Sequence, residues 1–576
     1  MEKVKFGDKE FIPSPYQEKI FENIEHGTSN MVINAVAGSG KSTTIINALS
    51  LIPQGKKVLF IAFNKDIVES LKEKIGKMPN VDIMTYHSLG YSIVKENYKK
   101  GGLGLNEYKY YQYVNANIIP KEGMNHTKFV SYVKNINKLI DYARFNLAQS
   151  VSEVEKIATK YNVTILDDEC SFVVDALKWG QDSLSEIDYT DMIWLPYELD
   201  FKTKFYKYDW VFVDEAQDSS PVQQQLFKKC FKRGARFCAV GDSSQCINAW
   251  AGADEKAFSK FLKMPNTKEY SLPISYRCPI SVINAAKKFV SQIEAAPNAV
   301  MGEIKYDVNS YSPKPGDMIL CRNTYPLIKL YTEYLRVNKK SFIRGKDIGE
   351  SLIELIDKYN PLNNSLLNKS LVSNGLFRSL YSHLFEMIDL MIENNGMSEN
   401  EAYLSEPVMA IYDSIMSLET LSEGLTTVDE LKGKIKTIFN EGQNESICLS
   451  TIHKAKGLEA DNVFILAKSL MPSRFAKQEW EIKSEENLEY VAITRAKKTL
   501  QYISETDFRV DRGWEFEKNL KIKFNTIREL LGTKPTQRKI NATIETSSIN
   551  NSNVIQPQNT NRKPIGALKF NKFLKR

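Results

Sequence analysis

The stretch from Ala35 to Thr43 constrains the fold of this chain more than any other, and it reads Ala-Val-Ala-Gly-Ser-Gly-Lys-Ser-Thr. It follows Met31–Asn34, a short apolar run typical of a β-strand, and precedes Thr44–Leu49, whose apolar spacing is that of a helix. A glycine loop between a strand and a helix lets backbone N–H groups approach a bound phosphate closely. The pattern therefore predicts a P-loop, and with it the binding of a nucleoside triphosphate.

Two residues of this loop carry its chemistry. We expect Lys41 to neutralise the β- and γ-phosphates and the Ser42 hydroxyl to bind Mg²⁺. Gly38 and Gly40 stand where the turn is tightest, although the first position of the usual pattern is Ala35 rather than glycine. The alternative is a glycine turn without a ligand, which the flanking strand and helix disfavour. The nucleotide contacts predicted in the loop are Ala37, Gly38, Ser39, Gly40, Lys41, Ser42 and Thr43.

Cysteine usage and hydropathy indicate the compartment. The seven cysteines are scattered and form no Cys-x-x-Cys pair, which argues against a disulfide framework or a zinc ribbon and favours reduced thiols. The charged start Met1–Lys5 lacks the apolar core of a signal peptide. No run of about 18 apolar residues suggests a membrane span. We therefore expect a cytoplasmic protein with no membrane partner.

The positive charge is confined to the C-terminal end. The chain has a formal net charge of +7, but residues 533–576 contain nine Lys or Arg and one acid, Glu545. That segment carries +8, which leaves the first 532 residues at −1. Binding of nucleic acid by the folded part must therefore come from a local groove rather than from a generally basic body.

Strand and helix patterns alternate in two separate parts of the chain, which indicates two α/β cores with parallel sheets. Helical periodicity dominates the segments between their strands, so each core is expected to carry a mostly helical insertion. Tyrosines cluster in the first insertion; they could stack on bases, but a packing face is favoured. The predicted boundaries are 1–88 and 206–269 for the first core, 89–205 for its insertion, 270–352 and 442–532 for the second core, 353–441 for its insertion, and 533–576 for a disordered basic tail.

Two neighbouring carboxylates, Asp214 and Glu215, directly follow the apolar run Val211–Val213. In a P-loop protein, an acid at this position binds Mg²⁺. The adjacent glutamate is suited to polarise an attacking water, which favours hydrolysis over nucleotide binding alone. Asp-Glu after a strand is otherwise often a helix N-cap, so the preceding P-loop is what gives the pair its meaning.

The chain is similar to UvrD/Rep/PcrA-type superfamily 1 DNA helicases. The resemblance begins at Val213–Asp218, which reads Val-Asp-Glu-Ala-Gln-Asp, and it extends from Gln17 to about Thr499. The other matching boxes follow in the family's order: Val240–Gln245 with Trp250–Ala253, Ser275–Arg277, Thr451–Glu459 and Glu489–Ala496. The resemblance implies two RecA-like cores that bind ATP and Mg²⁺ between them and single-stranded DNA across both.

The resemblance also implies a role for each matching residue. At the nucleotide, Gln17 would bind the adenine edge, Tyr276 would stack on the base and Glu459 would contact the ribose. Ser42 and Asp214 would bind the metal, and the catalytic residues would be Lys41, Glu215 as general base, Gln245 as γ-phosphate sensor, and Arg277 and Arg495 as arginine fingers. The residues expected to contact nucleic acid are Phe63, Asn64, Thr85, His87, Trp250, Thr451 and His453.

Three positions depart from the family's pattern. Thr43 stands where an arginine often follows the P-loop hydroxyl residue. Asn248 and Ala251 stand where many members have a tyrosine and an arginine. One stacking ring and one guanidinium are therefore missing near the expected strand contacts, so the coupling of strand binding to ATP state is expected to differ from that of close relatives.

The expected function is that of an ATP-dependent DNA helicase or translocase in replication, recombination or repair, acting on single-stranded DNA and on junctions with duplex. The Lys456–Glu459 step, Lys-Gly-Leu-Glu, resembles the members that move 3′ to 5′ rather than the opposite group, which tends to have Gln-Gly there. Two other functions remain open: a translocase that strips proteins from DNA, and an ATP-gated binding switch. The basic tail is expected to dock on an acidic protein partner or to add non-specific DNA affinity.

Overall fold

A computed structural model describes most of the folded part of the chain. The described residues are 4–6, 9–75, 78–98, 101–120, 126–161, 163, 169–204, 207–247, 252, 254, 256–360, 365–395, 397–439, 445–506 and 513–533. They all belong to one unit, Met1–Thr536. Trp250 and residues 534–576 of the basic tail lie outside the described residues.

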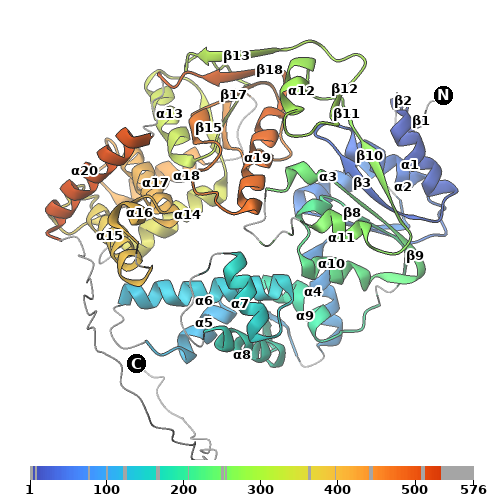
Figure 1. Cartoon of the computed structure of the whole chain (residues 1–576), viewed down its shortest axis with the longest axis horizontal. Coiled ribbons are helices and arrows are strands. Elements are labelled where there is room, and N and C mark those ends of the chain that lie inside the picture. The colour runs from blue at the N-terminus through green and yellow to red at the C-terminus, as the bar shows by residue number, and fades with distance from the viewer. Residues whose placement is uncertain are drawn as a thin grey trace, which may run out of the picture. The chain divides into compact units, whose positions relative to one another are not determined.

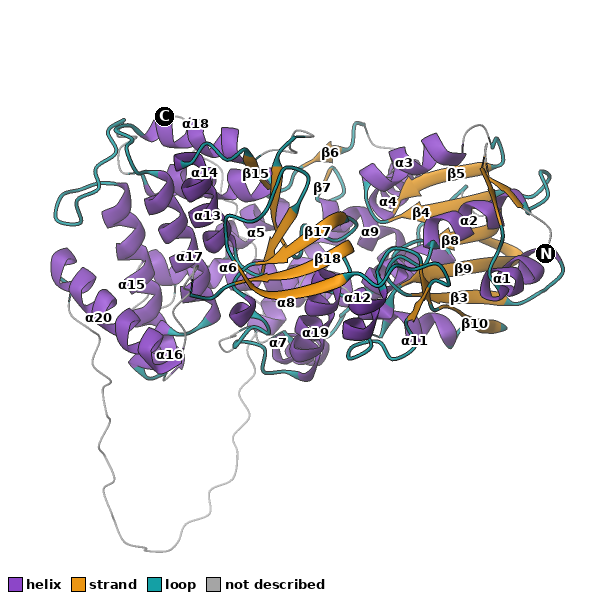
Figure 2. Cartoon of the chain, turned by 90° about the horizontal axis from the view of Figure 1, so that it is seen from above, coloured by secondary structure: helices purple, strands orange, loops and turns teal. Residues whose placement is uncertain are grey.

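The first sheet has six parallel strands (Figure 2). Their order is β10 (Thr267–Leu272), β3 (Asn30–Ala35), β9 (Phe231–Gly241), β8 (Tyr208–Val213), β4 (Val58–Ala62) and β5 (Val81–Thr85). The central strands are buried on both faces, which explains why they read as continuous apolar runs rather than as alternating patterns. One face packs against α1 (Pro15–Glu25), α2 (Lys41–Ser50) and α3 (Lys65–Ile75), and the other against α4 (Tyr86–Asn97), α10 (Pro221–Lys228) and α11 (Ala257–Leu262).

A helical insertion separates β5 from β8 (Figure 1). Beyond α4 it contains α5 (Lys109–Asn117), α6 (His126–Asn146), α7 (Val151–Lys160), α8 (Glu169–Asp182) and α9 (Tyr189–Glu198), with a two-stranded pair of β6 (Gly104–Leu105) and β7 (Glu186–Ile187). Its tyrosines mainly pack: Tyr110 is buried, and the ring of Tyr113 stacks on Trp179 with centroids 4.2 Å apart. Tyr108 and Tyr111 are exposed.

The second sheet also has six parallel strands, in the order β13 (Glu303–Val308), β18 (Ala496–Ile503), β17 (Ala460–Ile465), β14 (Met318–Cys321), β16 (Ile447–Thr451) and β15 (Ser341–Arg344). Flanking helices are α12 (Ile280–Ala286), α13 (Thr324–Arg336) and α19 (Glu479–Ile493). Between β15 and β16 lie α14 (Lys346–Tyr359), α15 (Leu376–Asn395), α16 (Glu399–Tyr403), α17 (Glu406–Leu421) and α18 (Val428–Ile438). The predicted fold class, two parallel-sheet α/β cores that each carry a mostly helical insertion, is confirmed.

Two segments lie elsewhere than the predicted boundaries suggest. Strand β10 pairs with β3, so the boundary predicted at 269/270 falls inside a strand of the first sheet. The last helix, α20 (Gly513–Leu531), packs on the second insertion rather than on the second sheet, because the Phe524 ring lies edge-on to the rings of Phe385 and Tyr403. Among the described residues, none of the helices has the length and apolarity needed to cross a bilayer.

The parallel arrangement brings the first core's predicted site residues to one edge. The P-loop follows β3, the paired carboxylates follow β8, and Asp242 follows β9; these three strands are neighbours in the sheet. Phe63 and Thr85 stand at the carboxyl ends of β4 and β5, on the other half of the same edge. Ligands of open parallel sheets bind outside the carboxyl ends of the strands. The strand order therefore separates a candidate nucleotide site from a candidate strand site.

Candidate functional site

The segment Ser275–Arg277, which follows the first sheet in the sequence, packs directly on the P-loop. Gly38 and Gly40 have positive φ angles of 72° and 75°. A Cβ at Gly38 would lie only 2.4 Å from the Cβ of Arg277, so a side chain has no room there. The Tyr276 backbone N–H donates to the Gly38 carbonyl over 2.8 Å. Glycine is thus required both for the turn and for this close approach.

Lys41 begins α2 and bridges the two carboxylates that follow β8. Its Nζ lies 3.1 Å from Oδ1 of Asp214 and forms a short hydrogen bond to Oε1 of Glu215. Burial lowers the pKa of Lys41, but the two carboxylates outweigh burial and hold that pKa above its usual value. Burial raises the pKa of Asp214, which Lys41 only partly offsets. The three groups form one buried charged cluster at the phosphate-binding end of the loop.

Glu215 adopts a left-handed backbone conformation, with φ at 49°, which turns it toward neighbouring donors. Gln217 Nε2 donates to its Oε2 at 2.5 Å, and Lys456 Nζ lies 3.8 Å from the same oxygen. Burial raises the pKa of Glu215. The nearby cations Lys41 and Lys456 lower this pKa by more than burial raises it, so that it falls to about 2. The side chain is therefore a carboxylate at neutral pH, as a general base requires.

Lys456 is a residue whose role the sequence did not reveal. It lies in the segment after β16, yet its Nζ contacts Asp218 Oδ2 at 2.5 Å and donates to the Gln245 carbonyl at 2.9 Å. The carboxylate of Asp218 is fully buried. The neighbouring Lys454 instead pairs with the exposed Asp347. Both lysines lie in the same matching box, and only the tertiary structure shows which one reaches the first core.

Arg495 also reaches the first core. It is 1% exposed, and its Nη2 donates to Oε1 of Gln245 over 3.4 Å. Gln245 in turn donates from Nε2 to Oδ2 of Asp242 over 2.8 Å. Burial and the nearby Arg277 lower the pKa of Arg495 to about 10, and burial raises the pKa of Asp242 to about 6. The positive charge of the guanidinium is therefore not fully balanced by nearby carboxylates. A bound anion would stabilise it.

A tyrosine of α19, the helix that ends just before Arg495, links the second core to the P-loop. The Tyr490 hydroxyl on α19 accepts a hydrogen bond from the backbone N–H of Ala37 at 3.0 Å and donates to Asp242 at 3.3 Å. Sequence matching placed Tyr490 within a box but gave it no role. Its buried hydroxyl joins the predicted phosphate loop directly to the second core.

The predicted arginine finger Arg277 and the predicted ribose contact Glu459 bind each other. Arg277 Nε donates to Glu459 Oε2 over 2.7 Å, and Lys497 Nζ lies 3.7 Å from the other carboxylate oxygen. Glu459 is partly exposed. The side chains of Arg277 and Glu459 therefore lie together beside the P-loop. Each still has donor or acceptor groups that could bind a ligand.

The two predicted base contacts flank Gly40. A Cβ at Gly40 would lie 3.9 Å from Nε2 of Gln17 and 3.9 Å from Cδ2 of Tyr276. Gln17 is buried; its Nε2 donates to Thr44 and its Oε1 accepts from the Ser14 N–H in a capping box. An amide has two hydrogens and two lone pairs, so one of each remains. Tyr276 is 51% exposed and has an accessible ring. Ser42 is exposed and Thr43 is partly buried in the first turn of α2.

The predicted strand contacts of the first core lie at the ends of β4 and β5. Phe63 is 44% exposed, whereas Asn64 accepts a hydrogen bond from the Ile67 N–H at the start of α3. Thr85 is buried and caps α4. His87 is exposed, and its ring lies edge-on to Tyr189 with centroids 6.4 Å apart. Tyr189, 48% exposed, is a further candidate that sequence matching missed.

The second core's predicted strand contacts lie at the end of β16. Thr451 is buried and His453 is partly buried. Burial and the cations Arg322 and Lys454 lower the pKa of His453 to about 3, so the imidazole is neutral at physiological pH. His453 would therefore bind a strand by stacking or hydrogen bonding rather than by charge. Trp250, with Asn248 and Ala251, lies outside the described residues.

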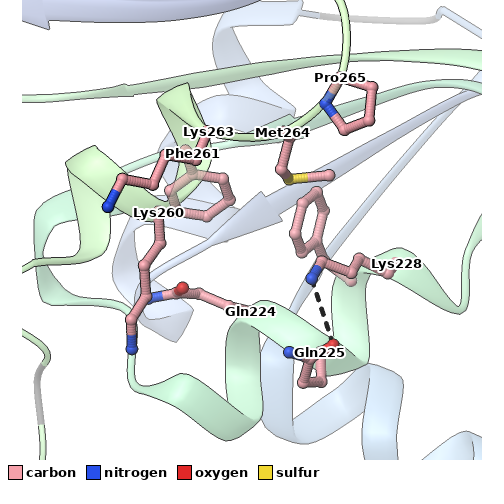
Figure 3. A pocket seen from close by; sticks show the side chains of 9 residues that line it. Gln224, Gln225, Lys228, Lys260, Phe261, Lys263, Met264 and Pro265 are labelled. Carbon is pink, nitrogen blue, oxygen red and sulfur yellow. Dashed lines mark hydrogen bonds between the residues drawn. The ribbon is translucent and has the colours of Figure 1, made fainter.

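A groove of about 360 Å³ lies elsewhere, between α10 and α11 (Figure 3). Its lining includes Lys228, Lys263 and Pro265, which lie at or beyond the C-terminal ends of these helices. The helices run antiparallel to the strands, so these ends lie at the amino edge of the sheet, away from the P-loop. The groove is therefore separate from the site described above.

Comparison with known proteins agrees with this geometry. Residues 16–266 match the UvrD/REP helicase N-terminal domain, and residues 348–507 match the UvrD-like helicase C-terminal domain. The chain is 23% identical over 602 residues to the ATP-dependent DNA helicase Rep of Buchnera aphidicola, covering 81% of this chain and 91% of that protein. It is 23% identical over 611 residues to the ATP-dependent DNA helicase PcrA of Staphylococcus aureus, covering 83% and 82%.

A third similar protein is longer. The F-box DNA helicase protein 1 of Schizosaccharomyces pombe is 26% identical over 511 residues, which cover 81% of this chain but 55% of that protein. The chain thus spans about half the length of this relative. The two domain matches cover the P-loop core and the segments that carry Lys456 and Arg495. The chain therefore belongs to the UvrD/Rep/PcrA-type superfamily 1 helicases, a family of ATP-dependent DNA helicases.

Proposed function

We propose that this protein hydrolyses Mg-ATP to move 3′ to 5′ along single-stranded DNA and to separate duplex ahead of it, in replication, recombination or repair. One observation carries the proposal: side chains of the second core, chiefly Lys456 and Arg495, contact the P-loop core at its candidate phosphate site. A nucleotide bound there would touch both cores, so hydrolysis would change how they fit together.

The residues present fit a magnesium nucleotide. Asp214 offers a buried carboxylate whose charge is already balanced by a cation, Lys41, and the Ser42 hydroxyl is exposed in the adjoining first turn of α2. Among the described residues, no group of three or more acidic, histidine or cysteine side chains forms a ready-made metal site. Mg²⁺ typically takes one or two protein ligands together with phosphate oxygens and waters. When bound, the ion would neutralise developing charge on the phosphates.

Lys41 and Glu215 would change partners when a nucleotide binds. The γ-phosphate competes with both carboxylates for the Lys41 ammonium. As Lys41 moves toward phosphate, Glu215 loses the stronger of the two cations that depress its pKa, and its basicity rises toward that of an ordinary glutamate. Glu215 would then accept a proton from the attacking water, while Gln245 and Arg495 would sense the γ-phosphate.

Strand movement follows from contacts on both cores. Phe63 and His87 would hold the strand on the first core, and Thr451 and His453 on the second. Arg277 and Arg495 would draw the cores together on binding ATP and release them after hydrolysis. Alternating grip by the two cores then advances the strand. The Lys-Gly-Leu-Glu step at Lys456–Glu459 supports the 3′-to-5′ direction by family resemblance.

A pair of duplexes that differ only in which strand carries the single-stranded tail tests the proposal. ATP-dependent unwinding of the 3′-tailed substrate alone is expected, with none by the Lys41→Ala variant. Unwinding only of the 5′-tailed substrate would overturn the direction. ATPase activity should also rise with strand length; no length dependence would instead indicate an ATP-gated switch. Length dependence without strand separation would indicate a motor that strips proteins from DNA.

A further inference from the structure

Arg144, in the C-terminal turn of α6 (residues 141–146), is the centre of a largely buried ionic cluster. Arg144 is 1% exposed, and its Nη1 donates to Asp188 and to Asp191, each at 2.8 Å. Its Nη2 donates to the second oxygen of Asp188 at 2.8 Å and to Asp141 at 2.6 Å. Asp191, itself fully buried, also binds Lys109 at 2.7 Å. Three helices, α5, α6 and α9, are thus joined by charged groups that cannot separate without leaving a charge unpaired in the interior.

This cluster holds the first turn of α9. Asp188 is the N-cap of α9 and Asp191 is its third residue, and the two form a capping box. Tyr189, between them, lies against the ring of His87. Helices α9 and α4 are in close contact, because a Cβ at Gly90 would lie 2.0 Å from the Met192 carbonyl oxygen. Arg144 therefore determines where the candidate strand contacts at His87 and Tyr189 stand.

The next residue, Phe145, contacts the other site. Gly252 has a φ of +90°, and a Cβ there would lie 2.9 Å from Cδ2 of Phe145. Gly252 follows Gln245 by seven positions in the chain. Two residues later, the Asp254 N–H donates to the Ser219 carbonyl, just beyond the 3₁₀ helix Ala216–Asp218 that follows Glu215. Phe145 thus packs on Gly252, which lies in the sequence between Gln245, a residue of the candidate nucleotide site, and Asp254, which is bonded next to that site.

We propose that residues 141–146 couple the nucleotide site to the strand contacts, with Phe145 and Arg144 as positioning residues. The inference rests on the proposed function. When a bound nucleotide displaces Gly252, Phe145 is displaced with it, because the ring lies so close that a Cβ at this glycine would be only 2.9 Å away. The ionic cluster then carries the displacement to α9 as a rigid unit, because Arg144 donates to both Asp188 and Asp191 and separating them would leave a charge unpaired in the interior. The strand contacts shift without either residue touching DNA or ATP.

Phe145→Leu tests this coupling because leucine keeps apolar contact but lacks the ring that meets Gly252. We expect the basal ATPase and the fold to be retained, while the stimulation by single-stranded DNA falls by roughly 2- to 30-fold, the range that single residues in coupling networks produce. Phe145→Tyr keeps the ring and should restore stimulation. Phe172→Leu is the matched control: Phe172 is another half-buried aromatic of the same insertion, and its ring packs on Tyr113. Its stimulation should match the parent.

A second variant tests the role of Arg144 in the ionic cluster. Arg144→Lys keeps the buried charge but offers fewer donors, so we expect weaker single-stranded DNA binding in the absence of nucleotide and an unchanged basal ATPase. Equal loss of stimulation in Phe145→Leu and Phe172→Leu, or full stimulation in Phe145→Leu, would overturn the inference. Failure of Phe145→Tyr to restore stimulation in a folded protein would also overturn it. Absence of stimulation in the parent would instead refute the proposed function.

Discussion

Replacing Lys456 with methionine should show how much the ion pair between Lys456 and Asp218 contributes to the stability of the protein. The Asp218 carboxylate is fully buried and has Lys456 at 2.5 Å as its cationic partner. Burial already raises the pKa of Asp218, and Lys456 offsets only part of that rise. Methionine preserves the length of the side chain but removes the charge, so the variant must either bury an unpaired carboxylate or protonate it.

Protonation limits the penalty and gives it a pH dependence. Holding a proton on a group with an ordinary pKa of 3.8 costs at most about 4.4 kcal/mol at pH 7 and about 2.3 kcal/mol at pH 5.5. A folded-state pKa above the unfolded value means that stability falls as pH rises, so the variant should lose most at neutral and alkaline pH. Glu215 also loses a stabilising cation, but because its pKa is lowered from 4.5 to about 2, this loss is already complete at pH 5.5 and does not change between pH 5.5 and 8.

Thermal unfolding of the parent and Lys456→Met between pH 5.5 and 8 measures this effect. The gap between their midpoints should be larger at pH 7 than at pH 5.5, by at most roughly 4–8 °C for a core of this size. Lys454→Met is the control, because the pair of Lys454 with Asp347 is exposed and contributes about 1 kcal/mol or less. A gap that does not change with pH, or no destabilisation at all, would refute the reasoning that Asp218 depends on Lys456.

Three further outcomes are expected. Glu215→Gln should keep ATP binding but lower turnover by about 10²–10⁴-fold, the usual contribution of a general base; turnover at the parent rate would show that another group activates the water. Trp250→Ala should weaken binding of single-stranded DNA by roughly 1–3 kcal/mol if one base stacks on it, whereas unchanged affinity with a lower melting temperature would make it a core residue. Deletion of residues 535–576 should leave basal ATPase unchanged; a large loss would mean that the tail belongs to the folded motor.

Local sequence was sufficient for the features that depend on short segments. The P-loop stands between β3 and α2 as its strand, glycine and helix signals predicted. The buried runs Val58–Ala62 and Trp210–Val213 are sheet strands because fully covered parallel strands need continuous apolar sequence. The order of the boxes also identified the family, since each box carries its own residue pattern.

Tertiary structure decided which core or insertion each segment belongs to. The sequence of β10 does not reveal that its edge pairs with β3, 237 residues earlier, because a strand's partner is set by the topology of the whole sheet. Helix α20 likewise has an apolar face, and only packing shows that this face covers α15 and α16. Long-range partner choice is not encoded in local periodicity.

The sequence alone determined which residue types stand ready for ATP chemistry: a lysine and a hydroxyl in a glycine loop, and two acids after a buried strand. Which side chains meet was decided by the tertiary structure, which brings Lys456 rather than Lys454 to Asp218 and buries Arg144 among three aspartates. The physical reason is that charge pairing depends on distance and burial, and residues 44 to 238 positions apart acquire both only when the sheets and their insertions pack together.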